Sequence, residues 1–92
     1  MRLTMAEAMK QAVEAPRPEY SPLARQMKVS GDVEVELRIN DRGTVDEVKV
    51  ISGNPLLTQP VLKTVKEWKF TPFKQDGEPA AVVTNLKFAF KL

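Results

Sequence analysis

The fold is decided by the stretch DVEVELRINDRGTVDEVKVI, residues 32–51. Apolar and charged side chains alternate through its first eight residues, which is the period of a strand buried on one face. The apolar members are Val33, Val35, Leu37 and Ile39. Residues 40–43 have the composition of a hairpin loop and end in a glycine, where a positive φ is expected. The stretch therefore predicts two antiparallel strands, over residues 32–39 and 44–51.

The second strand carries an irregularity that its apolar spacing reveals. Val45 and Val48 are three residues apart, so a regular strand would point them to opposite faces. A bulge at Asp46-Glu47 would bring both valines to the core face. The sequence SGNP, residues 52–55, then ends the strand.

A helix is predicted after the hairpin, because apolar residues recur there at helical spacing. These residues are Leu57, Val61, Leu62, Val65 and Trp68. Pro60 would break a helix interior, so the N-cap is expected near Thr58, with Pro60 inside the first turn. Trp68, the only tryptophan, lies on the apolar stripe and is predicted to be a core residue and not a ligand platform or a partner hot spot.

A third strand is predicted over residues 80–92, AAVVTNLKFAFKL, after a turn at Asp76-Gly77. The helix carries the chain back, so this strand runs antiparallel to the first one. The predicted fold is therefore α+β: a three-stranded antiparallel sheet, order 2-1-3, packed by a main helix. The C-terminal strand becomes an edge, where a peptide could add itself by backbone hydrogen bonding.

The N-terminal region is predicted to hold two further helices. Residues 4–15 have amphipathic spacing and begin with a Thr4/Glu7 capping box, so they predict an extra helix that stops at the Pro16-Arg17-Pro18 sequence. Ser21-Pro22 then opens a short helix before the first strand, whose Leu23 and Met27 are expected to face inward. We divide the chain into residues 1–17, the N-terminal helix with an extended segment, and the main domain, residues 18–92.

Composition excludes several classes of function. The 92 residues allow one small domain, and the absence of both cysteine and histidine removes the usual thiol nucleophile, general base and metal ligands. We therefore expect no enzyme, no metal and no cofactor. The net charge of +2, with acidic and basic residues interspersed, gives no basis for nucleic-acid binding.

A succession of short motifs carries a family resemblance. They are EYSPLARQ (19–26), GDVEV (31–35), GTVDEVKV (43–50), SGNPLL (52–57), WKFTP (68–72) and DGEP (76–79). In this order and spacing, the chain from Pro18 to Leu92 resembles the C-terminal domain of the TonB energy-transducer family. One departure is Ser21, where the family usually has a proline after the tyrosine.

The resemblance implies a periplasmic module that binds an extended peptide, the TonB box, of an outer-membrane transporter. It also implies a membrane anchor and inner-membrane motor proteins, reached through segments upstream of this sequence, that transmit force from the proton gradient. The peptide would pair beside the last strand and touch the stretch around Tyr20. The peptide-binding residues implied in this way are Glu19, Tyr20, Ala81, Val83, Asn85, Lys87, Ala89 and Lys91.

An alternative hypothesis is a structural or self-associating module with no transport role. A free strand edge favours pairing with a second copy, or domain exchange, as much as it favours peptide capture. The chain would then be a swapped or edge-paired dimer and not a monomer.

Overall fold

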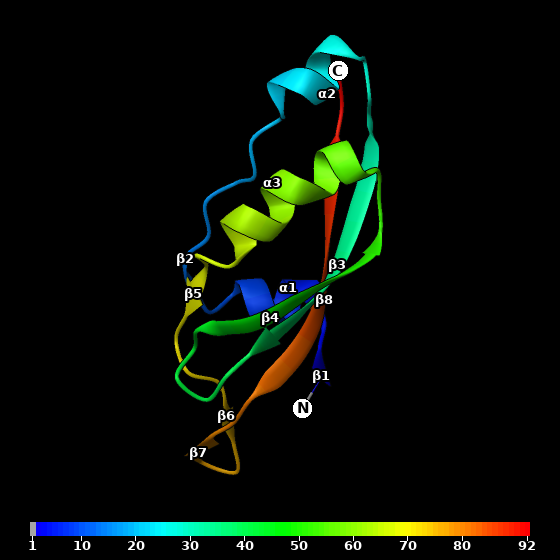
Figure 1. Ribbon diagram of the computed structural model, residues 1–92. Helices are drawn as coiled ribbons and strands as arrows, with labels where there is room; N and C mark the ends of the chain where they lie inside the picture. Colours follow the sequence, from blue (N-terminus) through cyan, green and yellow to red (C-terminus); the bar gives the residue numbers. More distant parts are fainter. Residues whose placement is uncertain (1) are drawn as a thin grey trace.

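The predicted hairpin is present in the computed structural model, which describes residues 2–92 of the chain (Figure 1). β3 (Gly31–Ile39) pairs antiparallel with β4 (Val45–Ser52). Between them the side chain of Asn40 organises the loop, since its Oδ1 accepts hydrogen bonds from the backbone N–H groups of Arg42 and Thr44, at 3.0 and 3.1 Å. Gly43 has a φ of +86°, which confirms the expected positive φ.

The bulge in the second strand is confirmed. Ile39 lies opposite Val45, whereas Arg38 lies opposite Glu47, so Asp46 is the extra residue on β4. Val45 is consequently packed against the core, and so is Val48. The side-chain parity of the sequence was therefore sufficient to locate the bulge.

The sheet contains four strands, and the predicted three-stranded sheet is wrong in that number. β8 (Val82–Phe90) pairs antiparallel with β3 along its whole length, and β1 (Arg2–Leu3) pairs in parallel with β8. The order is β1-β8-β3-β4, so the three long strands lie in the order β4-β3-β8 within it. A two-residue strand has no readable period, which is why the sequence pattern did not reveal β1.

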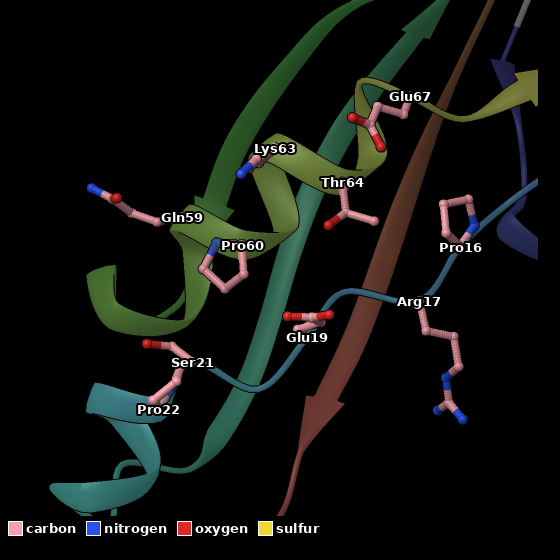
Figure 2. A pocket seen from close by; sticks show the side chains of 10 residues that line it. All are labelled: Pro16, Arg17, Glu19, Ser21, Pro22, Gln59, Pro60, Lys63, Thr64 and Glu67. Carbon is pink, nitrogen blue, oxygen red and sulfur yellow. The ribbon is translucent and has the colours of Figure 1, made fainter.

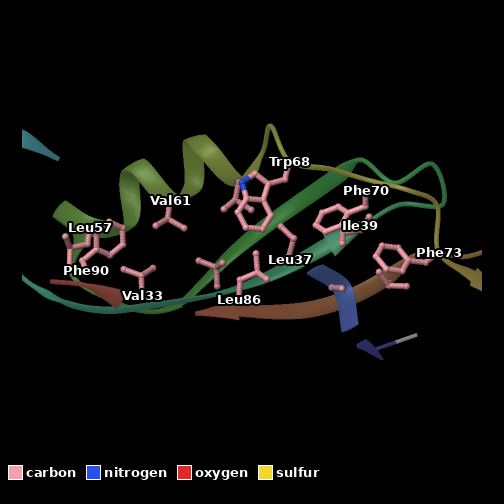
Figure 3. Close-up of a cluster of buried hydrophobic side chains, with 14 of the residues drawn as sticks. Val33, Leu37, Ile39, Leu57, Val61, Trp68, Phe70, Phe73, Leu86 and Phe90 are labelled. Atoms are coloured by element: carbon pink, nitrogen blue, oxygen red, sulfur yellow. The ribbon is translucent and has the colours of Figure 1, made fainter. Parts of the chain in front are cut away.

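The main helix, α3 (Pro55–Val65), lies across one face of the sheet (Figure 3). It begins earlier than predicted: the N-cap is Asn54, whose Oδ1 accepts from the N–H of Leu56 at 2.9 Å, and Pro55 is the first helical residue. Pro60 therefore lies inside the helix. The Asn54-Pro55 pair is a favourable start, and burial of the apolar helix face against the sheet offsets the hydrogen bond that Pro60 cannot make.

Trp68 is a core residue, as predicted, with 3% of its surface exposed. Its Nε1–H donates to the carbonyl oxygen of Pro16 at 2.8 Å, and its ring meets Phe88 edge to face with centroids 5.8 Å apart. The core continues beyond it through Phe70, in β5 (Lys69–Phe70), and Phe73 (Figure 3). The tryptophan thus ties the extended segment, residues 16–21, to the centre of the domain.

The N-terminal helix is much shorter than the predicted 4–15. α1 (Met5–Met9) has the expected capping box between Thr4 and Glu7, but the chain then forms β2 (Ala12–Glu14), which pairs antiparallel with β5. In this pairing Val13 is exposed. Backbone pairing with β5 takes the place of two helical turns, and Ala12 and Ala15 still pack against the core.

The remaining elements are α2 (Pro22–Gln26) and a hairpin of β6 (Lys74–Gln75) and β7 (Glu78–Pro79). The hairpin turns at Asp76-Gly77, as predicted, with φ of +53° and +83°. The helix starts at Ser21-Pro22, as predicted, but Leu23 and Met27 are 50% and 61% exposed, so their expected inward orientation is wrong. Ala24 is instead the buried residue of α2. The prediction failed because a five-residue helix has too few apolar positions for the sequence pattern to show which side faces the core.

Candidate peptide-binding site

A cleft of about 430 Å³ runs beside the C-terminal half of β8, and we call it the edge cleft. Residues 87–91 line one wall as an unbroken run. Because successive side chains of a strand point to opposite faces, a wall made of consecutive residues lies along the edge of the strand and not on one face. The facing wall is formed by Met5, Met9, Ala15, Arg17, Pro18, Tyr20 and Trp68.

Aromatic side chains hold the extended segment at a fixed position beside this edge. The ring of Tyr20 packs edge to face on Phe90, with centroids 5.5 Å apart, and its hydroxyl donates to the carbonyl oxygen of Val29. The guanidinium of Arg25 lies over the Tyr20 ring, with its Cζ 5.4 Å from the ring centroid. With Trp68 bonded to Pro16, the segment is held at both ends, and the cleft remains between it and β8.

Three basic residues line the edge cleft: Arg17, Lys87 and Lys91. The Nζ of Lys87 lies 3.6 Å from the carboxylate of Asp32 on β3, and both side chains are more than half exposed. An ion pair of this kind contributes little to stability, so Lys87 can change partner at small cost. The charged residues of the edge cleft are therefore all positive, and the other lining residues form an apolar floor.

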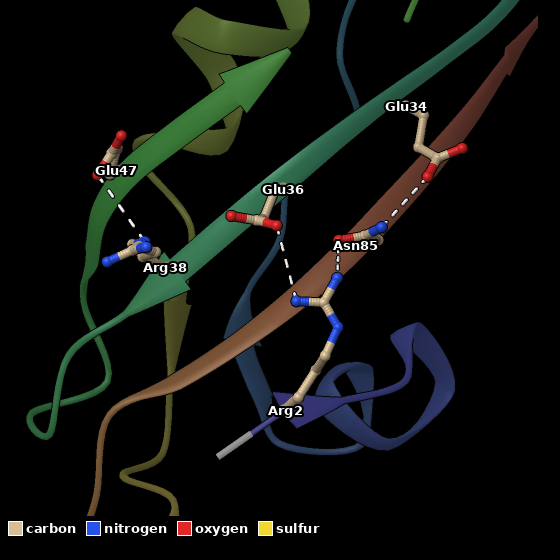
Figure 4. A network of polar contacts seen from close by, with 6 residues as sticks. All are labelled: Arg2, Glu34, Glu36, Arg38, Glu47 and Asn85. Carbon is tan, nitrogen blue, oxygen red and sulfur yellow. Dashed lines mark hydrogen bonds and ion pairs between the residues drawn. The ribbon is translucent and has the colours of Figure 1, made fainter. Parts of the chain in front are cut away.

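The first part of the β8 edge is covered by β1. Arg2 lies opposite Val83, and its guanidinium donates to Oδ1 of Asn85 at 2.9 Å and lies 3.6 Å from the carboxylate of Glu36 (Figure 4). Asn85 in turn donates to the Glu34 carboxylate at 3.2 Å. The C-terminal strand is thus an edge only beyond these residues, which corrects the prediction of a wholly free edge.

The structure brings half of the predicted binding residues together. Tyr20, Lys87, Ala89 and Lys91 all line the edge cleft. The other four do not line it, for three different reasons. Val83 and Asn85 are occupied by β1, and Ala81 precedes the first residue of β8. Glu19 lines a different groove.

This second groove, of about 570 Å³, separates the extended segment from α3 (Figure 2). Glu19, Arg17, Lys63 and Glu67 stand around it as interspersed charges of both signs. Proline rings and short polar side chains form the rest of its lining. The groove is the space left where an extended chain crosses a helix, and it has no apolar floor comparable to that of the edge cleft.

Sequence reasoning missed several residues of the site. Met5 and Met9 lie at helical spacing within the predicted 4–15 helix, but the period of a helix does not say what its apolar face will touch. Trp68 was predicted to be a core residue, yet it also lines the cleft, as does Phe88 of the C-terminal strand. Arg17 had no signal beyond its place between two prolines.

Residues 2–92 contain neither a metal-ligand cluster nor a membrane-spanning helix. Within this part of the chain, no group of three or more acidic side chains is arranged so that it could hold a metal ion. The helices described there are too short and too polar to cross a bilayer.

A long hairpin closed by β8, a helix across one face and a cleft along a partly open edge define an α+β domain with a sheet-edge site. The chain belongs to the family described as Gram-negative bacterial TonB protein C-terminal, which it matches over residues 16–92. The resemblance expected from Pro18 to Leu92 is thereby confirmed.

The comparisons with individual proteins agree with this assignment. The chain is 32% identical over 78 residues to protein TonB of Vibrio cholerae, and 32% identical over 79 residues to protein tonB2 of Pseudomonas aeruginosa. These alignments cover 83% and 84% of this chain, but only 32% and 29% of the relatives. Protein TonB of Escherichia coli is 27% identical over 75 residues, covering 78% of this chain and 30% of the relative. The chain therefore spans about a third of the length of these proteins.

The fold is also similar to a solved structure, the solution NMR structure of the Pseudomonas aeruginosa TonB C-terminal domain. The TM-score is 0.76, at 24% sequence identity, and the superposition covers 89% of this chain and 85% of the other. This likeness shows the fold and does not by itself show the ligand.

Proposed function

We propose that this chain is the transporter-coupling domain of a TonB-like energy transducer in the periplasm of a Gram-negative bacterium. Its partner is an outer-membrane TonB-dependent transporter, which presents an extended TonB-box segment. Inner-membrane motor proteins would act on the domain through the remainder of a longer protein. Membership of the family supports this proposal, since the proteins that match the chain carry the name TonB.

The observation that carries the binding mode is the position of the edge cleft along residues 87–91 of the sheet edge. An extended peptide placed there adds a strand to β8, so that main-chain hydrogen bonds give affinity and side-chain pockets give specificity. Four of the residues implied by the family resemblance are proposed contacts: Tyr20, Lys87, Ala89 and Lys91. Arg17 and Phe88 join them because they line the same cleft.

Peptide titration followed by NMR tests this proposal. A synthetic TonB-box peptide should shift the backbone amides of residues 87–91 most strongly. Peptides N-methylated at one residue at a time should lose affinity at every second position, because alternate N–H groups of an added strand point to its partner. A loss of equal size at all positions, or shifts that concentrate on the second groove, would contradict strand addition at β8.

Two matched substitutions separate the edge cleft from the wider stretch predicted from the resemblance. Ala89 and Ala81 are both exposed alanines, but only Ala89 lines the cleft. Ala89→Trp should weaken peptide binding at least tenfold by filling the cleft, whereas Ala81→Trp should change it less than twofold. Thermal denaturation of both variants serves as the control for folding.

Self-association is a second candidate, and the charge pattern of β4 favours it. β4 is the other end of the sheet order, and Val50 and Ile51 on it are 38% and 49% exposed. Two copies of β4 that pair antiparallel about Val48 would place Glu47 opposite Lys49 of the partner copy, in both directions. Light scattering over a concentration series should then show a dimer that Glu47→Lys abolishes and that the double variant Glu47→Lys/Lys49→Glu restores. A constant monomer mass for the unaltered chain would reject this candidate.

A further inference from the structure

β1 occupies the sheet edge at the point where the proposed docking strand would otherwise begin. Its two residues pair with Val83 and Thr84, and the edge cleft starts further along β8, at Lys87. We propose that β1 is a built-in competitor: residues 2–3 cover the first part of the docking edge in the free protein, and the bound peptide displaces them. This inference rests on the proposed function and adds a regulatory step to it.

The contacts that hold β1 are few and mostly exposed. The strand has two ladder positions, compared with nine for β3 against β8. The side chain of Arg2 is 59% exposed, so its ion pair with Glu36 adds little. Elements with few buried contacts and exposed hydrogen bonds open at low free energy, far below global unfolding. β1 is therefore the part of the sheet that can leave without unfolding the rest.

Thr84, the residue of β8 that lies beside Leu3 of β1, carries an unsatisfied polar group. Thr84 is fully buried, and its hydroxyl has no hydrogen-bond partner among residues 2–92. Leu3 lies opposite Thr84 and packs on the core from the same edge. A buried hydroxyl without a partner is destabilising, so removal of β1, which lets water reach this position, relieves part of the cost of opening.

The length of β1 is set by the helix that follows it. Thr4 is the N-cap of α1, with its Oγ1 accepting from the N–H of Glu7 at 3.2 Å, so the chain turns away from β8 after Leu3. Met5 and Met9 of α1 then form part of the facing wall of the edge cleft. Because Thr4 alone joins β1 to α1, displacement of β1 should also move Met5 and Met9.

A reversible crosslink tests the competitor model. The chain has no cysteine, and Arg2 and Val83 are neighbouring partners on β1 and β8, so the double variant Arg2→Cys/Val83→Cys can lock β1 in place by oxidation. A TonB-box peptide should bind the reduced form about tenfold more tightly than the oxidised form, the loss expected when one or two backbone hydrogen bonds are forgone. Amide shifts should extend to Val83 and Thr84 only in the reduced form.

The matched control is Gln75→Cys/Glu78→Cys, which places the same crosslink between partner residues of the β6–β7 hairpin. Its peptide affinity should not depend on oxidation. Equal affinity of the oxidised and reduced β1–β8 variant would overturn the competitor model and leave docking at residues 87–91 standing. Failure of the peptide to bind any form, including the unaltered chain, would overturn the docking proposal and the competitor model together.

A single substitution gives an independent readout. Arg2 holds β1 through Asn85 and Glu36, so Arg2→Ala should raise peptide affinity about two- to fivefold if β1 competes with the peptide. A direct peptide contact would produce the opposite change. Reduced affinity, or no change, for Arg2→Ala therefore argues against competition.

Discussion

β3 and the N-terminal segment, residues 2–14, both lie against other strands of the domain, but different interactions hold them. β3 is paired on both sides, and its four inward residues are at most 1% exposed. In the N-terminal segment only Ala8 is fully buried, and β1 and β2 are each paired on one side. The comparison shows that burial is concentrated in β3, β8 and α3, whereas the proposed binding edge is bordered by a segment held by a few local bonds.

Removal of a central side chain should give the largest effect. Trp68→Ala is expected to lower the free energy of unfolding by about 3–5 kcal/mol, because it leaves a cavity at the junction of α3, the sheet and the extended segment. Trp68→Phe keeps most of the volume but loses the bond to Pro16, so it should cost less than half as much. Urea denaturation measures both values; a loss below 1 kcal/mol for Trp68→Ala would mean that the core does not depend on this residue.

The β3–β4 loop and the β6–β7 turn offer a sharper comparison, because each contains one glycine with a positive φ. Gly43 and Gly77 have nearly the same φ, +86° and +83°, but an added Cβ would meet Phe70 backbone oxygen at 2.0 Å from Gly43 and nothing within 4 Å from Gly77. Gly77→Ala should therefore cost about 1 kcal/mol from the left-handed φ alone. Gly43→Ala should cost about 3 kcal/mol or more, because it also breaks the bond from the Phe70 N–H to the Gly43 carbonyl. Similar unfolding midpoints for the two variants would refute the steric argument.

A change in the N-terminal segment should remain local. Thr4→Ala removes the cap of α1 and should destabilise that helix by about 1 kcal/mol, with little effect on global unfolding. Hydrogen exchange should show faster amides in α1 and unchanged amides in β3. Ser21→Ala is the matched control, since Ser21 is also an N-cap but makes no side-chain cap bond. Global destabilisation by Thr4→Ala would mean that the segment is part of the cooperative core.

The smallest expected effect is a pH dependence confined to the same cap. The hydrogen bond from the Thr4 backbone N–H, followed by that from its hydroxyl, lowers the pKa of Glu7 below the ordinary value of 4.5. A lowered folded-state pKa stabilises the cap above pH 4.5, and this contribution is lost as the pH falls through the lowered value. Amide shifts of Thr4 and Glu7 should titrate together in this window, and Glu7→Gln should abolish the transition. Titration of Glu7 above pH 4.5 would reverse the sign.

Much of the fold could be read from side-chain periodicity. The hairpin, its bulge at Asp46 and the core position of Trp68 all follow from which side chains must avoid water. The errors concern the short elements β1, α1 and α2, together with the start of α3. For these, local bonds and neighbouring surfaces compete on nearly equal terms, and a pattern of a few residues cannot decide between them.

The candidate site was only partly within reach of the sequence. Tyr20, Lys87, Ala89 and Lys91 were identified and line the edge cleft. The cover over Val83 and Asn85 and the wall from Met5 and Met9 were not, because they depend on where the N-terminal segment packs. The sequence alone determined which strands and helix make the core, since burial of alternating apolar residues is a property of each segment. Only the tertiary structure decided how much of the β8 edge stays open, because backbone groups pair with whichever strand lies nearest and carry no sequence code of their own.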